Sequence, residues 1–405
     1  MNGWQETKFG ELVDVVNGFA FKSANFLENM EDGSLPVLKI KNVANGNVHL
    51  HGIQYHEYSQ NLLRYVAKQG DVLIALTGNH PQAETQVVGL VSRYKLDRVA
   101  LINQRVAKIV SKNEETLSID YVYYFLKDTN THLYLASQSS GSANQANISK
   151  SDIENIPFLL PPQKEQKAIA TVLSSLDDKI DLLHRQNKTL EAMAETLFRQ
   201  WFVEEAGNWE EVALEDITNR ITDGAHASPP TVETGLPMAS VKDMYQWGIN
   251  TASCRQISQD DFDELVRTDC RPLKNDILIA KDGSYLKHVF VAEDDLDVVI
   301  LSSIAILRPN GKYHPLLLAI FLKLESTRES LENIVTGAVI PRIVLKDFRK
   351  YKLLLPPKQL QDQALAFIQP IYEKCWENDR QIRTLETLRD TLLPKLMSGE
   401  VRVAV

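Results

Sequence analysis

Two groups of residues have a spacing that could support metal-dependent chemistry, and both have a simpler explanation. Residues 165–167, Glu-Gln-Lys, match the ExK half of a nuclease metal site, but no Pro-Asp pair precedes them at the end of a strand. We therefore expect a solvated helix face at this position. His49, His51 and His56 lie close together, and an alternating strand with polar faces explains their spacing more simply than a metal site. The sequence thus predicts no catalytic residue and no metal site in this chain.

Motifs for nucleotide binding and for methyl transfer are missing from the sequence. No GxGxxG follows a predicted strand, and no GxxxxGK[ST] loop is present to hold a triphosphate. A self-sufficient amino-methyltransferase would carry an Asn/Asp-Pro-Pro-aromatic tetrad. The nearest strings, NIPF at 155–158 and SPPT at 228–231, do not fit it. A stand-alone nuclease or methyltransferase is therefore disfavoured, and we expect no cofactor in this chain.

Polar residues in several short clusters could instead contact a nucleic acid. Asn and Gln can bond an adenine edge at two atoms, and Arg or Lys can bond a guanine edge. Gln104 and Arg105 lie in a strand-like run, so we expect one of the two to point inward. Ordinary loop polarity is the alternative explanation for each single residue. In the first half of the chain the candidates are Lys22, Ser23, Lys39, Lys41, Asn42, Thr77, Asn79, His80, Gln104, Arg105, Asn144, Gln145 and Asn147. In the second half they are His226, Ser228, Lys242, Lys281, Ser284, Lys287, Ser303 and Arg342.

The segments that carry these clusters form an internal repeat. Two kinds of segment, called A and B, occur twice along the chain in the order A–B–A′–B′. Trp4 begins WQETKFGELVDVVNG, and Trp209 begins WEEVALEDITNRITDG, 205 residues later. The string LPPQKEQKAIA at 160–170 returns as LPPKQLQDQAL at 355–365, with an offset of 195. The A copies diverge from each other, whereas the B copies keep their pattern.

Each A segment has the pattern of a mixed α/β domain. The apolar runs VLIALTG at 72–78 and ILIAKDG at 277–283 predict strands that end at Gly, and VVILSSIAIL at 298–307 predicts another strand. The segments 121–128 and 316–326 predict short helices.

Each B segment predicts one long helix that begins at a Pro-Pro pair, 161–162 or 356–357. Apolar residues alternate at spacings of three and four, which is typical of a heptad seam and favours packing of the two helices against each other. Ordinary amphipathic helices packed on their own domains are the alternative. In an antiparallel pair, Asn187 should meet Asn378 near the middle of the helices. The predicted helix–helix interface comprises Leu173, Leu176, Ile180, Leu183, Asn187, Leu190, Leu197, Ile368, Ile371, Cys375, Asn378, Ile382, Leu385 and Leu392.

The bulk composition is that of a globular protein with room for two or three domains. The net charge of −9 argues against wholesale nucleic-acid binding. Residues 1–155 carry 14 Lys and Arg against 16 Asp and Glu, whereas residues 205–350 carry 16 against 23. Any contact with DNA must therefore come from local patches. The three cysteines form no CxxC pair, and no signal peptide or membrane-length apolar run is present, so we expect a cytoplasmic protein.

At this point the sequence resembles a known family, the specificity subunits of type I restriction–modification systems. The resemblance covers essentially the whole chain and is carried by VNGFAFKSANF at 16–26, GDVLIALTG at 70–78, INQRVAKI at 102–109, the segment 141–181, ITDGAHASPP at 221–230 and GAVIPRIVLKDFRKYKLLLPP at 337–357. It implies an α+β fold with two mixed α/β target-recognition domains, two long antiparallel helices as a coiled-coil spacer, and a pseudo-twofold repeat. The expected boundaries are 1–158 for the first recognition domain, 159–204 for the first spacer helix, 205–353 for the second domain and 354–405 for the second helix and tail.

The same resemblance implies a non-catalytic chain that recognises a bipartite, asymmetric target in double-stranded DNA. It implies two methyltransferase subunits that carry S-adenosylmethionine, and restriction subunits that carry ATP hydrolysis and cleavage. The second recognition domain is unusually acidic for such a reader. A coiled-coil adaptor for protein partners, without a role at DNA, is the alternative hypothesis, but it explains poorly why the A copies diverge while the helices keep their register.

Overall fold

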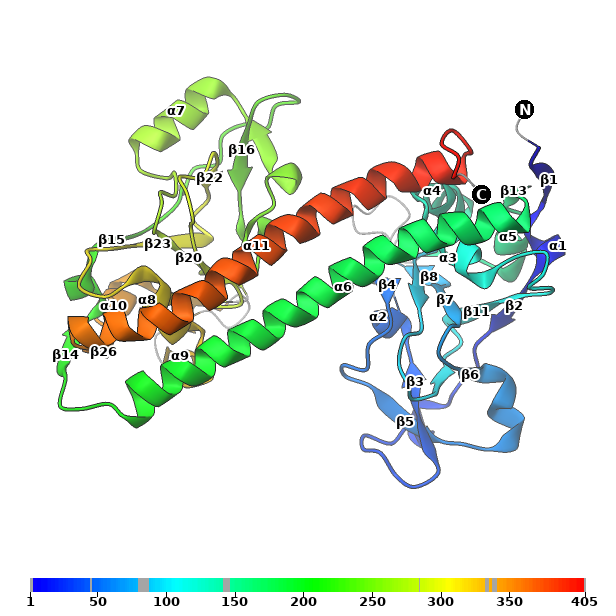
Figure 1. Ribbon diagram of the computed structural model, residues 1–405, viewed down its shortest axis with the longest axis horizontal. Helices are drawn as coiled ribbons and strands as arrows, with labels where there is room; N and C mark the ends of the chain where they lie inside the picture. The colour runs from blue at the N-terminus through cyan, green and yellow to red at the C-terminus, as the bar shows by residue number, and fades with distance from the viewer. Residues whose placement is uncertain are drawn as a thin grey trace. The chain divides into compact units, whose positions relative to one another are not determined.

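The computed structural model describes residues 3–43, 46–78, 87–140, 146–283, 285–331, 335–336 and 341–403. They form two compact units. Unit 1 comprises Met1–Ile180 together with Arg383–Val405, and unit 2 comprises Asp181–Ile382. Each unit contains one mixed α/β domain and one half of each of two long helices, α6 and α11, which Figure 1 draws in green and in orange to red.

Unit 1 is built from short strands in two main sheets. The first sheet has the order β2-β11-β7-β9-β4, and the second has the order β5-β3-β10-β6; β1 pairs with β13, and β8 pairs with β12. Most pairings are antiparallel, but β3 with β10 and β4 with β9 are parallel. The strands are β1 (Gln5–Lys8), β2 (Val13–Asn17), β3 (Ser34–Leu38), β4 (Gly46–Asn47), β5 (Gln54–Glu57), β6 (Val66–Ala67), β7 (Val72–Ala75), β8 (Thr77–Gly78), β9 (Val91–Arg93), β10 (Ala100–Ile102), β11 (Val106–Ser111), β12 (Ala146–Asn147) and β13 (Pro157–Leu160).

Unit 2 repeats the main strand pairings of this arrangement, without counterparts of β4 and β6 in the corresponding sheets. The sheet β15-β23-β20-β21 corresponds to β2-β11-β7-β9, the sheet β19-β16-β22 corresponds to β5-β3-β10, and the pair β14-β26 corresponds to β1-β13. Even the one parallel pairing of the smaller sheet recurs, between β16 and β22. The strands are β14 (Glu210–Ala213), β15 (Thr218–Asp223), β16 (Leu236–Ala239), β17 (Met244–Tyr245), β18 (Gly248–Ile249), β19 (Arg255–Ile257), β20 (Ile277–Ala280), β21 (Val289–Val291), β22 (Val299–Ile300), β23 (Ile304–Pro309), β24 (Val335–Thr336), β25 (Arg342–Ile343) and β26 (Lys352–Leu355).

Three α-helices of the domains are also duplicated, as α3 and α8, α4 and α9, and α5 and α10. The helices predicted at 121–128 and 316–326 are confirmed as α3 and α8, each of which is almost wholly buried against its sheet. The helices of unit 1 are α1 (Phe9–Leu12), α2 (Ile40–Val43), α3 (Ile119–Lys127), α4 (Thr129–Gln138) and α5 (Lys150–Glu154). Those of unit 2 are α7 (Gln259–Arg267), α8 (Pro315–Lys323), α9 (Glu325–Leu331) and α10 (Leu345–Arg349).

One expectation for the strands was wrong. The apolar run 298–307 is not a single strand, because it divides into β22 and β23 with a turn at 302–303. The turn is needed because β22 pairs with β16 in one sheet, whereas β23 pairs with β15 and β20 in another. The continuous apolar run therefore indicated that both strands are buried, but it could not indicate that the chain passes from one sheet to another between them.

The long helices begin where the sequence predicts, directly after the Pro-Pro pairs. The first, α6, spans Gln163–Arg199 and continues as a π-helical turn over Gln200–Glu204, and α11 spans Lys358–Met397. Proline suits this position because the first turn of a helix lacks partners for its N–H groups in any case.

A buried glutamine anchors each helix to its own domain with the same three hydrogen bonds. In unit 1, Gln166 Nε2 donates to the carbonyls of Thr116 and Pro161, and its Oε1 accepts from Ser118 N, all at 2.9 Å. In unit 2, Gln361 makes the corresponding three bonds, also at 2.9 Å, to the backbone of Lys312, Pro356 and His314. Both amides are fully buried. The docking of helix to domain is therefore a duplicated feature.

The helices run antiparallel within each unit. In unit 2, Asn378 Nδ2 donates to Asn187 Oδ1 at 2.8 Å, and Asn187 Nδ2 donates to Cys375 O at 3.0 Å. The predicted meeting of the two asparagines is confirmed. In unit 1, Asp177 of α6 accepts from Arg389 of α11 at 3.0 Å. Burial raises the pKa of Asp177, but the neighbouring cations, Lys127 and Arg389, outweigh it and hold that pKa below its usual range.

All residues of the predicted helix–helix interface are buried or half-buried. Leu173, Ile180, Leu183, Asn187, Ile368, Cys375, Asn378 and Ile382 are buried, and Leu176, Leu190, Leu197, Ile371, Leu385 and Leu392 are half-buried. Within the described residues, no helix is long and apolar enough to cross a membrane.

Candidate nucleic-acid interface

In unit 1, three of the polar residues predicted to contact DNA meet in one cluster. Thr77 Oγ1 donates to Asn147 Oδ1 at 2.8 Å. The Nη1 group of Arg105 donates both to Thr77 Oγ1 at 3.1 Å and to Asn147 Oδ1 at 2.9 Å. Thr77 is buried, Asn147 is half-buried and Arg105 is exposed. We call these three residues the first polar cluster.

Backbone hydrogen bonds fix the three segments that carry this cluster. The N–H of Leu76 donates to the carbonyl of Arg105 at 2.9 Å, and the N–H of Ile148 donates to the carbonyl of Leu76 at 2.9 Å. Thr77 and Asn147 are direct partners in the β8–β12 pair. These bonds connect three segments: the end of β7, the turn that precedes β11, and the strand β12. The cluster therefore lies on a rigid backbone frame.

Unit 2 contains the same frame with different side chains. The N–H of Lys281 donates to the carbonyl of Ser303 at 2.9 Å, and the N–H of Ile343 donates to the carbonyl of Lys281 at 3.1 Å. Asp282 and Arg342 are bridge partners, as Thr77 and Asn147 are in unit 1. We call Asp282, Ser303 and Arg342 the second polar cluster; their counterparts are Thr77, Arg105 and Asn147.

A buried ion pair lies beside the second polar cluster. Lys281, which occupies the position of Leu76, contacts Asp223 Oδ2 through Nζ at 2.6 Å and lies 3.8 Å from Asp282 Oδ1. The side chains of Lys281 and Asp223 are only 9% and 13% exposed. His226 Nε2 lies 3.2 Å from the other oxygen of Asp223, and the His226 side chain is 78% exposed. The carboxylate thus links a buried cation to an exposed imidazole.

In each unit a glycine allows the segment that follows it to lie close to the backbone beside the polar cluster. A Cβ atom at Gly18 would lie 2.2 Å from Asn103 O, and a Cβ atom at Gly224 would lie 2.0 Å from Ile300 O, distances that no side chain tolerates. The segments that follow both glycines pair with the turn that carries Arg105 or Ser303. The loops that begin VNGF and TDGAH therefore share one structural cause.

The other described candidates are distributed around these frames. Lys39 is half-buried and its ammonium group lies 4.4 Å from the centre of the Phe26 ring. Five candidates, Asn79, His80, Asn144, Gln145 and Ser284, lie outside the described residues. Besides His226, the described candidates outside the two clusters that are exposed to solvent are Lys22, Ser23, Lys41, Gln104, Ser228, Lys242 and Lys287.

Two expectations about side-chain direction need correction. Asn42 is fully buried, and its amide is occupied by the backbone of Lys39, His49 and His51, so it does not face solvent. Gln104 and Arg105 are both exposed, because they form a turn between β10 and β11 and do not continue the strand. A turn removes the alternation of faces from which an inward residue was expected.

The residues first weighed for metal chemistry have structural roles. Glu165 does not lie on a solvated face as expected: it is 2% exposed, accepts from Trp4 Nε1 at 3.0 Å and forms an ion pair with Arg402. Of the histidines, His56 lies in β5, whereas His49 and His51 lie in the loop before it, so the expected alternating strand covers only one of them. Among the described residues, no group of three or more His, Cys, Asp or Glu side chains is placed to hold a metal ion.

Asp282 of the second polar cluster and the neighbouring Asp223 were not among the residues predicted from the sequence. Amides and cations fit the base-edge pairings at adenine and guanine, whereas carboxylates do not. The repeat contained the missing signal, since the offset of 205 that aligns KQGDVLIALTG with LKNDILIAKDG places Asp282 opposite Thr77. Matching positions between the two copies would have identified Asp282 as a cluster residue.

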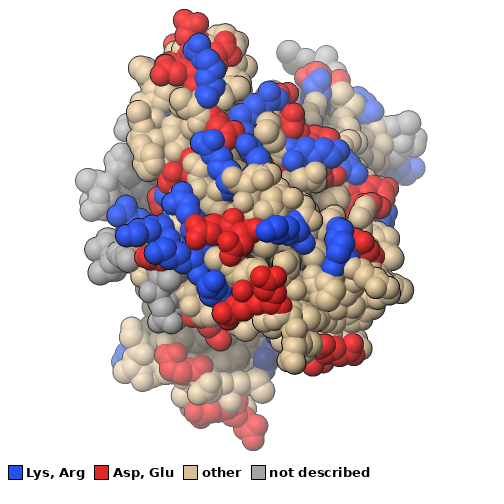
Figure 2. Space-filling model, turned by 90° about the vertical axis from the view of Figure 1, so that its left-hand side faces the viewer, with Lys and Arg blue, Asp and Glu red and all other residues tan. Residues whose placement is uncertain are grey.

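The surface charge of unit 2 is mixed. On the face shown in Figure 2, which carries β14, β26 and α10, Lys and Arg side chains are interspersed with Asp and Glu. No large field of one sign covers this face, so electrostatic attraction of DNA is not a property of the face as a whole.

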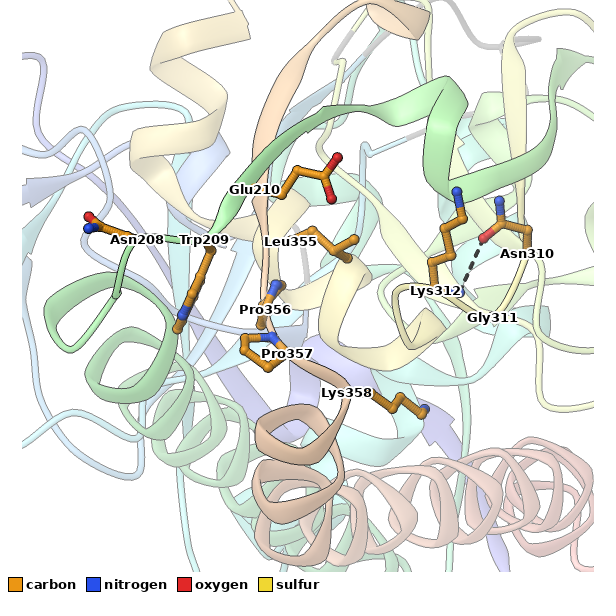
Figure 3. A pocket seen from close by; sticks show the side chains of 10 residues that line it. All are labelled: Asn208, Trp209, Glu210, Asn310, Gly311, Lys312, Leu355, Pro356, Pro357 and Lys358. Carbon is orange, nitrogen blue, oxygen red and sulfur yellow. Dashed lines mark hydrogen bonds between the residues drawn. The ribbon is translucent and has the colours of Figure 1, made fainter.

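An open pocket of about 690 Å³ lies where β26 passes into α11 (Figure 3). Its lining includes Trp209, Pro356, Pro357 and Lys358, and the loop of Asn310, whose side chain accepts from Lys312 N at 3.1 Å. None of the candidate DNA-contacting residues that the structure describes lines it. The pocket therefore belongs to the junction of domain and helix and is separate from the second polar cluster.

Two similar domains with polar clusters on one backbone frame, connected by two long helices, define a protein with an internal repeat in one chain. The family model of the type I restriction modification DNA specificity domain matches residues 1–192 and 206–386. The chain belongs to this family, and its role is recognition of a DNA target.

Relatives agree with this assignment over nearly the whole length. The chain is 26% identical to the type I restriction enzyme MjaIX specificity subunit of Methanocaldococcus jannaschii, over 98% of this chain and 97% of the relative. It is 22% identical to the EcoBI specificity subunit of Escherichia coli, over 99% and 86%. The crystal structure of a type I restriction–modification S subunit from M. genitalium has a similar fold, with a TM-score of 0.58, 18% identity and coverage of 98% and 96%.

Proposed function

We propose that this chain recognises a bipartite, asymmetric target in double-stranded DNA, with one half-site contacted by each unit. One observation carries the proposal: the two units share a backbone frame around their polar clusters, and the side chains on that frame differ in type and charge. Direct readout depends on donor and acceptor patterns at base edges, so different side chains on one frame suit two different half-sites.

The long helices supply the second part of the proposal, a common docking platform for partner subunits. Their attachment through Gln166 and Gln361 is the same in both units, in contrast to the clusters. A repeated platform suits two copies of one partner. We propose that these partners are two methyltransferase subunits, which carry S-adenosylmethionine, and that restriction subunits with ATP-dependent activity join the same complex. This chain itself is proposed to be non-catalytic and to hold no cofactor.

The test is methylome sequencing of cells that express this chain together with its methyltransferase subunit. We expect one methylated motif made of two different half-sites separated by a fixed number of unspecified base pairs. Cells that express the methyltransferase subunit alone should lack this motif. A coiled-coil adaptor without a role at DNA would give no methylated motif that depends on this chain, and that result would refute the proposal.

A further inference from the structure

Arg105, an exposed arginine of unit 1, is held by neutral side chains, unlike two half-buried arginines of the same unit. Its Nη1 group donates to two neutral oxygens, Thr77 Oγ1 and Asn147 Oδ1, which are themselves hydrogen-bonded to each other. By contrast, Arg93 and Arg389 of the same unit each meet a carboxylate, at 2.9 and 3.0 Å. The charge of Arg105 is therefore oriented by its partners but not neutralised by them.

The remaining donors of Arg105 are available for a ligand. A guanidinium carries five N–H donors in one plane, and the bonds to Thr77 and Asn147 use only Nη1. Within the part of the chain that the structure describes, no partner contacts Nε or Nη2 of this side chain. These two atoms form the edge of the fork that can make two parallel hydrogen bonds to a pair of acceptors.

The frame beneath the fork is rigid. Thr77 is 4% exposed and lies in the β8–β12 pair, and the carbonyl of Arg105 accepts a backbone bond from Leu76. Asn147 Oδ1 accepts from both Thr77 and Arg105, which fixes the orientation of its amide. Recognition of a base edge requires a fixed plane and a fixed direction, whereas attraction to a phosphate requires mainly charge.

We propose that Arg105 reads a guanine in the half-site bound by unit 1, donating from Nε and Nη2 to the O6 and N7 acceptors in the major groove. The inference rests on the proposed function. Thr77 and Asn147 are positioning residues, which set the plane of the guanidinium without contacting the base. Unit 2 has Ser303 at the corresponding place, so its half-site is not read by an arginine from this turn.

The experiment uses the full chain in complex with its methyltransferase subunits, and the wild-type methylome first defines the target. Arg105→Lys keeps the charge and loses the fork, so we expect roughly 5- to 150-fold weaker discrimination at one guanine of one half-site. The other half-site should be unchanged. Arg64→Lys, at an exposed arginine of the same unit outside the cluster, is the matched control and should leave the motif intact.

A second measurement separates a base contact from a phosphate contact. Fluorescence anisotropy with a duplex that carries 7-deazaguanine at the identified position removes only the N7 acceptor. Wild-type binding should weaken several-fold, and the complex with Arg105→Ala should not weaken further, because the two changes remove one interaction. Thr77→Val should lose part of the discrimination and Thr77→Ser should retain it, with melting temperatures as a check of folding.

The possible outcomes are distinct. Loss of affinity that is equal for all sequences, with guanine still required at every original position, would identify a phosphate contact and overturn the inference. Unchanged discrimination in Arg105→Lys would also overturn it. Absence of any bipartite motif in the wild type would instead refute the proposed function.

Discussion

At the crossing of three backbone segments, unit 1 holds one guanidinium between two neutral side chains, whereas unit 2 holds two carboxylates, a buried lysine and an arginine. The backbone bonds beneath these groups correspond one to one. A frame whose hydrogen bonds are made by the main chain tolerates exchange of the side chains above it. This explains how the two domains can diverge in chemistry while they keep one topology.

The comparison also shows where divergence has a structural cost. Unit 1 places Leu76 inside its core, and unit 2 places Lys281 at the same position, where the lysine requires Asp223 as a partner. At least one carboxylate of unit 2 therefore serves to compensate a buried cation. The following predictions test which differences between the units concern recognition and which concern stability.

The largest expected effect follows from breaking the buried pair of unit 2. Asp223→Ala leaves Lys281 charged and without its main partner, which should lower the free energy of unfolding by about 3–5 kcal/mol. Urea denaturation measures the loss. The double variant Lys281→Leu/Asp223→Asn reproduces the pattern of unit 1, where Leu76 and Asn17 stand, and should recover most of it.

A surface pair in the same unit provides the control. Asp297 is 95% exposed and contacts Arg271 at 2.6 Å, so Asp297→Ala should cost less than about 1 kcal/mol. If Asp223→Ala is equally mild, or is as harmful in the Lys281→Leu background, burial of the lysine does not determine the stability of this site.

The glutamine anchors should behave alike in both units. Gln166→Ala and Gln361→Ala each leave two carbonyls and one N–H without their partner, and the carbonyl of Pro161 or Pro356 is then buried without a hydrogen bond, at a cost of about 2–3 kcal/mol in each unit. Hydrogen exchange at the amides of Ser118 and His314 should accelerate in the respective variant. Gln163→Ala, which removes a more exposed bond to Glu114 O, should have a much smaller effect. Strongly unequal losses would show that the duplicated docking is not equivalent in energy.

The asparagine pair marks the point where the helices depart from their repeat, because the counterparts of Asn187 and Asn378 are Ile382 and Leu183. Asn187→Leu alone leaves the buried amide of Asn378 without its hydrogen-bond partner and should lower the free energy of unfolding by about 1–3 kcal/mol. The double replacement by leucine should be neutral or stabilising, since Asn378 Oδ1 has no partner among the described residues. Thermal denaturation of the single and double variants decides. A double variant less stable than the single would contradict this account.

The smallest expected effect concerns only one half-site. His226 is exposed beside the second polar cluster, and its polar contact within the described part of the chain is with Asp223, so His226→Ala should leave stability nearly unchanged. For a base-edge contact, discrimination should fall by ~1–3 kcal/mol at one position of the half-site read by unit 2. Methylome sequencing reports it. Equal loss at both half-sites would show that the histidine does not belong to one reader.

Much of the architecture could be predicted because it depends on local periodicity and on repetition. The heptad spacing predicted both long helices, the Pro-Pro pairs predicted their first residues, and the register predicted that Asn187 meets Asn378. The predicted strands at 72–78 and 277–283 became β7 and β20, with β8 following β7. These features are determined by residues close together in the chain, or by two copies of one pattern.

The candidate site depended on tertiary structure, because its partners are far apart in sequence. Thr77, Arg105 and Asn147 converge only because β8, the turn before β11 and β12 are hydrogen-bonded together. Asn42 and Glu165 were expected at the surface but are buried. Their polar groups are hydrogen-bonded to atoms that the sequence pattern does not bring together. By itself the sequence determined the two repeated domains and their helices. The fold decided which polar side chains are positioned to contact a ligand, because a buried polar group must find partners that only the folded chain supplies.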